Sequence, residues 1–185
     1  MPRFSGEYDC KLDAKGRFRL PAALLKQLEA TGKHLVVNRG IEKCLVLYTK
    51  ADWDTQVAEL EKLNQYVEKN RQFIRFFMRG STEMSPDSAD RLLIPKRLKE
   101  HANIDKEIIL FAYMNKIEIW AKEAYDNMLN DEPEDFSSLA EEVMGNINEW
   151  ILNERMNESF SMDEVLNEKV NRVMIHSFKI HSLIH

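Results

Sequence analysis

The chain has 185 residues, of which 44% are hydrophobic and 31% are charged, and its formal net charge is −5. This length allows one large domain or two small ones, and the apolar content is enough for a buried core, which excludes an intrinsically disordered protein. Because no apolar run approaches the roughly 20 residues of a membrane helix and the first residues lack the apolar segment of a secretory signal, we expect a cytoplasmic protein without a membrane partner.

In the first half of the chain, the residue pattern predicts a β-hairpin followed by short strands and helices. Residues 6–13 and 18–20 alternate between polar and apolar, and Gly16 is free to take a positive φ in the turn between them. Pro21 ends the second strand. The elements expected next are a short helix at 22–28, strands at 34–38 and 44–48, a helix that begins at a capping box of Thr49 and Asp52, and a helix at 66–79.

The second half repeats the first. The stretch LDAKGRFRLP at 12–21 aligns with PDSADRLLIP at 86–95 at a constant offset of 74, which falls to 72 by Tyr48 and Trp120. The pattern predicts a second short helix at 96–101, strands at 108–113 and 117–120, and a helix from about Glu123. Two β-β-α-β-β-α units of this kind predict an α+β fold in which the two repeats form one pseudo-twofold body, since each is too small to bury a core alone.

The C-terminal region differs from both repeats in its charge. Residues 123–168 contain 14 Asp and Glu and one basic residue, a net of −13, so the rest of the chain carries −5 + 13 = +8. Candidate capping boxes at Ser138 and at Ser161 predict helices in an acidic extension over 131–185. The body is therefore basic, and local charge decides whether it attracts a phosphate backbone.

The turn of the first hairpin is the strongest candidate for a DNA-binding site. Lys15, Gly16 and Arg17 form the turn, and Arg19 follows it; Arg3 adds a fifth candidate near the N-terminus. Arginine can donate to guanine or to phosphate, and glycine lets the backbone approach a phosphate closely.

A structural interpretation of the same turn stays open. Asp13 and Arg17 flank the turn, as Asp87 and Arg91 do in the second repeat, so each pair could simply hold its turn together. That interpretation does not explain Lys15 and Arg19, whose counterparts in the second repeat are Ala89 and Leu93.

The sequence contains no motif that indicates catalysis, a cofactor or a metal. Nucleophile-elbow, Walker, zinc-protease and dinucleotide-binding patterns are absent. Cys10 and Cys44 are expected to be small core residues. A remote alternative is a metal-dependent enzyme that uses the histidines of the C-terminal tail, His176, His181 and His185.

The motifs resemble the MraZ family, a family of duplicated swapped-hairpin (SpoVT-AbrB) proteins. The segments that carry the resemblance run in family order over about residues 3–128 and read FSGEY, LDAKGRFRLP, NRGIEKCLVLY, DSADRLLIP and NKIEIW. The resemblance implies two AbrB-like repeats at 1–64 and 81–130, a linker helix at 65–80 and the acidic extension at 131–185.

The resemblance also implies a function. Members are DNA-binding transcription factors of the cytoplasm and nucleoid, which assemble into homo-oligomeric rings on tandem direct repeats before their own division and cell-wall operon, usually as repressors. It implies that Asp13 and Arg17, then Asp87 and Arg91, are the two family motifs. Asp90 stands where the family's second turn carries glycine, and its carboxylate predicts weaker DNA binding there. The alternative is an AbrB-like protein–protein scaffold or an antitoxin-type module, which would not need the basic turn.

Overall fold

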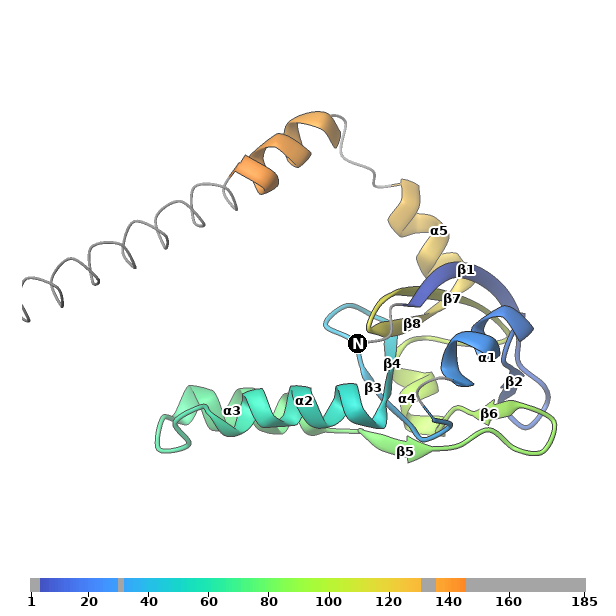
Figure 1. The fold of residues 1–185 in the computed structure, drawn as a ribbon, viewed down its shortest axis with the longest axis horizontal. Helices are drawn as coiled ribbons and strands as arrows, with labels where there is room; N and C mark the ends of the chain where they lie inside the picture. Colours follow the sequence, from blue (N-terminus) through green and yellow to red (C-terminus); the bar gives the residue numbers. More distant parts are fainter. Residues whose placement is uncertain (1–3, 30–31, 131–135, 146–185) are drawn as a thin grey trace, which may run out of the picture. The chain divides into compact units, whose positions relative to one another are not determined.

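The computed structural model describes residues 4–29, 32–130 and 136–145, and the chain divides into two compact units, Met1–Asp131 and Glu132–His185. The first unit is α+β, as expected (Figure 1). Its elements in chain order are β1 (Phe4–Lys11), β2 (Arg17–Arg19), α1 (Ala22–Glu29), β3 (Leu35–Arg39), β4 (Leu45–Thr49), α2 (Lys50–Glu61), α3 (Glu68–Met78), β5 (Thr82–Met84), β6 (Arg91–Leu93), α4 (Lys96–His101), β7 (Glu107–Met114), β8 (Lys116–Ala121) and α5 (Lys122–Asn130).

The strands form two antiparallel sheets. The larger has six strands in the order β1-β7-β8-β4-β3-β5, and the smaller consists of β2 and β6. The predicted strands and helices are therefore present in the predicted order, but the local pairing of the first hairpin is wrong. β1 pairs with β7 and β2 pairs with β6, so both arms of the hairpin pair with strands of the other repeat. The fifth strand makes the reciprocal exchange, because β5 pairs with β3 of the first repeat.

The register of two strand pairs reveals the pseudo-twofold axis. Phe18 of β2 lies opposite Leu92 of β6, and Val46 of β4 lies opposite Glu118 of β8. These partners are equivalent residues of the two repeats, since they differ by the repeat offsets of 74 and 72. A residue that faces its own counterpart lies on the axis that relates the repeats, so the body has the predicted pseudo-twofold symmetry.

The larger of two hydrophobic clusters in the described residues is shared by both repeats. Its members include equivalent leucines and isoleucines from the two halves, each at most 3% exposed: Leu20 and Ile94, Leu24 and Leu98, Leu47 and Ile119. Because the strands are exchanged, each half completes the core of the other, which is how a unit too small to bury a core alone becomes stable.

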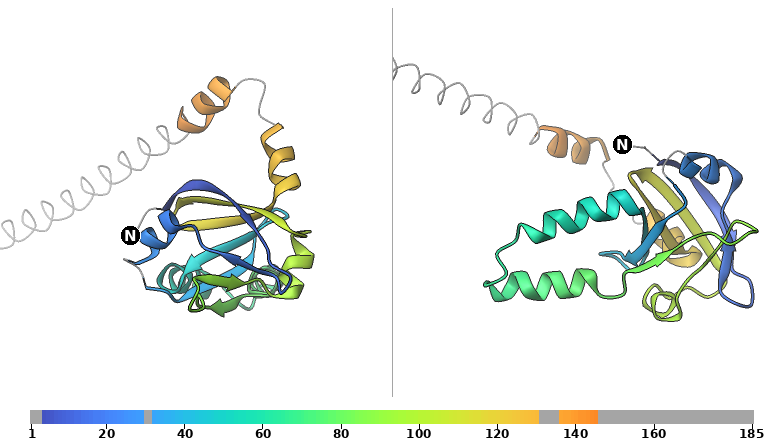
Figure 2. Two further views of the ribbon diagram at one scale, coloured as in Figure 1. Left: turned by 90° about the vertical axis from the view of Figure 1, so that its right-hand side faces the viewer. Right: turned by 60° about the horizontal axis from the view of Figure 1, so that its bottom comes forward.

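Helices α2 and α3 form a hairpin that projects from the strands (Figures 1 and 2). The predicted capping box is confirmed: the Thr49 hydroxyl accepts from the Asp52 backbone N–H at 3.1 Å and donates to the Asp52 carboxylate at 2.5 Å. Phe77 of α3 stacks on Trp53 of α2 with ring centroids 5.8 Å apart. At the far end of α3, the Asn38 amide donates to the Phe77 carbonyl at 2.8 Å, which fixes the end of the helix to β3.

In the second unit the described residues, 136–145, are helical. The helix includes Phe136, so Ser138 lies inside it and the predicted capping box at Ser138 is wrong. The candidate helix at Ser161 and the three tail histidines lie outside the described residues. Over the part of the chain that is described, no helix is long and apolar enough to cross a membrane.

Candidate nucleic-acid interface

The turn between β1 and β2 is organised around the Asp13 carboxylate. One oxygen, Oδ1, accepts the backbone N–H groups of Lys15 at 2.9 Å and Arg17 at 3.0 Å. The other, Oδ2, accepts Nε of the Arg17 guanidinium at 2.8 Å and pairs with its Nη2 at 2.7 Å. Aspartate suits this position because its short side chain reaches the backbone two and four residues ahead. The structural interpretation of the Asp–Arg pair is thus confirmed for the first repeat.

The turn between β5 and β6 has the same construction. The Asp87 carboxylate accepts the backbone N–H groups of Ala89 and Arg91 at 2.9 and 3.0 Å, and it pairs with Nε and Nη2 of Arg91, both at 2.9 Å. Four hydrogen-bond donors with equivalent positions therefore converge on each carboxylate. The repeated motif is explained by the turn it builds.

Hydrogen bonding to the charged form lowers the pKa of both aspartates to about 2. For Asp13 the largest cause is the backbone N–H of Arg17, followed by the Arg17 side chain. For Asp87 the largest cause is the Arg91 side chain. Both carboxylates are accordingly ionised at any pH near neutrality, and both ion pairs are formed there.

The two turns lie beside each other at the β2–β6 end of the body. The backbone N–H of Leu20 donates to the Asp90 carbonyl at 2.9 Å, and that of Ile94 donates to the Gly16 carbonyl at 3.1 Å. Arg17 Nη1 also lies 3.8 Å from the Asp87 carboxylate of the other turn. The structure therefore brings the two motifs, 74 residues apart in sequence, into one site; the constant offset indicated their equivalence but could not indicate this contact.

Gly16 and Asp90 occupy equivalent positions with the same left-handed backbone, at φ values of 81° and 57°. Glycine adopts this conformation freely, and aspartate is one of the few other residues that tolerate it. Lys33 Nζ lies 3.6 Å from the Asp90 carboxylate. Sequence reasoning missed Lys33, because nothing in its own neighbourhood connects it with a turn almost 60 residues away.

Charge distinguishes the two turns. Residues 13–21 carry Lys15, Arg17 and Arg19 against Asp13, a net of +3 − 1 = +2, whereas residues 87–95 carry one arginine against two aspartates, a net of −1. Lys15 and Arg19 are exposed, and within the described ranges neither side chain has an ion-pair partner. Arg3 lies outside the described residues.

Among the described residues, the other candidate groups do not form a chemical site. In the described residues, no group of three or more His, Cys, Asp or Glu side chains could hold a metal ion. Cys44 is buried and Cys10 is half-buried, and burial raises the pKa of these thiols to about 12 and about 11, which makes them unreactive.

Known proteins match this chain over most of its length. A family model described as "MraZ protein, putative antitoxin-like" matches twice, at residues 3–76 and 77–147. A protein of Flavobacterium psychrophilum is 43% identical over 151 residues, which is 80% of this chain and 96% of that protein. Proteins of Christiangramia forsetii and Cytophaga hutchinsonii are 44% and 40% identical over 79% and 78% of this chain, and over 96% of their own length. All three are named transcriptional regulator MraZ.

Proposed function

Because this chain belongs to the MraZ family, we propose that it is a transcriptional regulator that binds double-stranded DNA and is not an enzyme. The observation that carries the proposal is a pair of exposed cations, Lys15 and Arg19, on the turn at the β2–β6 end, which form no ion pair with any residue that the structure describes. Exposed cations on a turn held by hydrogen bonds suit a phosphate backbone, whereas a pure protein scaffold has no need of them.

In this proposal some residues of the site contact DNA and others hold the turns in shape. Lys15 and Arg19 contact DNA, and Gly16 allows the backbone of the turn to come close to it. Arg17 holds the turn through Asp13 and adds positive charge from a side chain that is 26% exposed. Arg91 holds the second turn, where the Asp90 carboxylate weakens DNA binding. Arg3 adds a further contact from the N-terminal residues.

A single turn offers few phosphate contacts, so several protomers must act together. We propose that copies of the chain form a closed ring that binds tandem direct repeats in front of its own division and cell-wall gene cluster and represses it at the nucleoid. Repeats spaced by about one helical turn, ~10 base pairs, keep successive turns on one face of the duplex. Simultaneous contacts raise the effective concentration of each further turn and hence the affinity.

The test is a fluorescence-anisotropy titration with DNA from upstream of the gene and with shuffled DNA, at two salt concentrations. We expect the wild type to bind the upstream DNA more tightly, and Lys15→Ala and Arg19→Ala each to weaken binding and reduce the salt slope by about 1. Lys62→Ala, on the projecting hairpin, is the matched control and leaves binding unchanged. Equal binding of upstream and shuffled DNA at both salt concentrations would contradict the proposal and favour the scaffold or antitoxin-type alternative.

A further inference from the structure

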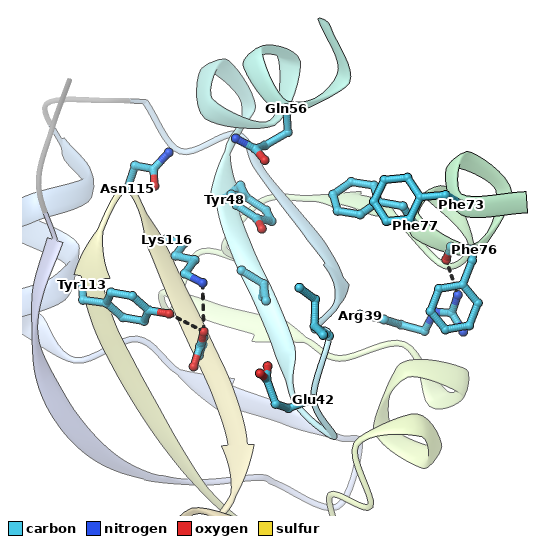
Figure 3. Close-up of a pocket in the computed structure, with 14 residues that line it drawn as sticks. Arg39, Glu42, Tyr48, Gln56, Phe73, Phe76, Phe77, Tyr113, Asn115 and Lys116 are labelled. Atoms are coloured by element: carbon cyan, nitrogen blue, oxygen red, sulfur yellow. Dashed lines mark hydrogen bonds and ion pairs between the residues drawn. The ribbon is translucent and has the colours of Figure 1, made fainter. Parts of the chain in front are cut away.

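Arg39, the last residue of β3, carries a guanidinium group whose position is fixed but whose hydrogen bonds are incomplete. Figure 3 shows the side chain beside the pocket that it lines, where Nη2 donates to the Phe76 carbonyl and the group lies 4.7 Å from the centroid of the Phe76 ring. The Nε atom is buried and has no hydrogen-bond partner among the described residues. A buried donor of this kind is rare in folded proteins and is usually explained by a bound water molecule or ion.

His101, the last residue of α4, provides a second buried nitrogen of this kind. Its Nε2 atom has no hydrogen-bond partner in the part of the chain that the structure describes. Burial is the largest cause that lowers the pKa of His101, and the positive charges of Arg39 and Lys43 lower it further. Because interactions between charges weaken with distance, these three side chains lie near one another.

The link between α3 and β5 brings a fourth cation to the same place. A methyl group at Gly80 would lie 3.0 Å from Leu98 Cδ2 of α4 and 3.8 Å from Arg39 Cγ, so the link passes closely between α4 and the end of β3. Arg79 directly precedes this point and is exposed. Burial lowers the pKa of Arg39, and the charge of Arg79 lowers it further.

The four basic side chains therefore come from four segments: Arg39 from β3, Lys43 from the β3–β4 turn, Arg79 from the α3–β5 link and His101 from α4. Within the described ranges none of them forms an ion pair.

The acidic residues next to this cluster do not neutralise it. Glu100, beside His101, lies 3.9 Å from Lys96 instead, and Glu42, beside Lys43, pairs with none of the four cations. A water molecule could bond to Arg39 Nε and His101 Nε2, but it would not compensate the repulsion between like charges. A bound anion does both, because it accepts hydrogen bonds and carries the opposite charge.

We propose that Arg39, Lys43, Arg79 and His101 form a binding site for a phosphate group. The N–H groups of a guanidinium match the spacing of phosphate oxygens, and a protonated histidine donates from Nε2. Lys43 and Arg79 are exposed and receive the anion from solvent. The group belongs to a small phosphorylated molecule or to the DNA backbone, since both present the same oxygens. None of the four residues belongs to the turns at the β2–β6 end.

An NMR titration of the full chain with inorganic phosphate tests the site. Chloride is exchanged for phosphate at constant ionic strength, and the ring Cε1–H resonance of His101 is identified by its loss in His101→Gln. We expect this resonance to shift and saturate with phosphate, and the pKa of His101 to rise, because an anion stabilises the charged imidazole. The resonance of His34 is the internal control and should not saturate.

Arg79→Gln is the decisive variant, because its side chain is exposed and its loss leaves the contact of Arg39 with Phe76 intact. It should weaken phosphate binding by about tenfold, as expected for the loss of one charged hydrogen bond. Lys96→Gln, which removes a cation that is 89% exposed on α4, is the matched control and should bind phosphate as the wild type does. The proposal is overturned if the His101 resonance responds equally to phosphate and chloride, or if Arg79→Gln binds phosphate as tightly as the wild type.

A DNA titration of Arg79→Gln distinguishes the two sources of the phosphate group. A variant that loses phosphate binding and also binds DNA more weakly, with a smaller salt slope, assigns the site to the DNA backbone. A variant that loses phosphate binding but binds DNA as the wild type does assigns it to a small phosphorylated molecule. A wild type that binds phosphate at His101 but no specific DNA supports the site and contradicts the proposed function.

Discussion

At the scale of single residues, two side chains with the same place in the repeat have different consequences. Gly16 and Asp90 share a left-handed backbone, and the carbonyl oxygen of each accepts a backbone N–H from the other repeat. Only Asp90 adds a negative charge at the surface that we propose faces DNA. The aspartates at the start of each turn, in contrast, accept hydrogen bonds from equivalent donors of their own turn, and these bonds hold the backbone of the turn.

Asp13→Asn and Asp87→Asn should change how stability depends on pH. A folded-state pKa of about 2, lower than the usual 3.8, means that each carboxylate contributes stability above about pH 4, and that this contribution is lost as the pH falls toward 2. The amide keeps the backbone hydrogen bonds but not the charge, so each variant should be less stable at pH 7 and show a shallower loss between pH 4 and 2. Urea unfolding at several pH values measures the free energy of unfolding of each variant, and the exposed Asp105→Asn is the control. If that free energy falls between pH 4 and 2 as steeply in both variants as in the wild type, the prediction is wrong.

Asp90→Gly should tighten DNA binding without a loss of stability. The substitution removes a carboxylate. Glycine adopts the φ of 57° without strain but loses more conformational entropy on folding, and these two effects on stability should cancel to within about 1 kcal/mol. The lost contact with Lys33 is a surface pair, and such pairs contribute little. Anisotropy titrations and thermal unfolding check both parts. Asp90→Asn is the control for charge: it should tighten binding as well, and a gain with glycine alone would point to steric approach instead.

At the scale of elements, side chains at the two ends of the α2–α3 hairpin determine where its helices begin and end. Thr49 and Asp52 cap the start of α2, and Asn38 and Arg39 of β3 donate to the last carbonyl groups of α3. The hairpin is therefore joined to the sheet at both ends.

Thr49→Ala should destabilise the protein by about 1–2 kcal/mol, because it removes the N-cap and leaves the buried Asp52 carboxylate with a weaker set of partners. Thr49→Ser keeps the hydroxyl and should recover most of the loss. Thr55→Ala, which removes an exposed hydroxyl that bonds back to the Ala51 carbonyl, is the control and should change stability little. Chemical denaturation followed by circular dichroism distinguishes these outcomes.

The sequence was sufficient to predict elements but not their partners. Alternation at 6–13 and 18–20 correctly indicated strands, because the period of side chains along a strand is a local property. It could not show that β1 pairs with β7, since both a local and an exchanged hairpin bury the same face. The basic turn was likewise visible in the sequence, whereas the contact of the two turns depends on residues that only the fold brings together.

At the scale of the whole molecule, the two repeats share their hydrophobic clusters, and the C-terminal unit carries a net negative charge of its own. Residues 132–185 contain eleven acidic and four basic side chains, a net of −7, so their removal changes the formal charge from −5 to +2. The family match ends at residue 147, within this unit.

Removal of residues 132–185 should strengthen non-specific DNA binding, since it removes negative charge that competes with phosphate for the basic surface. Anisotropy with shuffled DNA at two salt concentrations measures the effect, and circular dichroism confirms that the first unit is folded. A full-length variant with the acidic residues of 132–168 changed to amides is the control for charge. The prediction fails if both proteins bind shuffled DNA as the wild type does.

The exchange of strands also has a consequence for synthesis of the chain. Phe4 pairs with Met114, 110 residues later, and β2 pairs with β6 across 74 residues. Pairings so distant in sequence fold slowly. β2 has no partner until β6, at Arg91–Leu93, has left the ribosome, and β1 has none until β7, at Glu107–Met114, has done so. A nascent or prematurely terminated chain therefore cannot present the basic turn in its folded form, so an incomplete translation product would not compete with the finished regulator for its DNA.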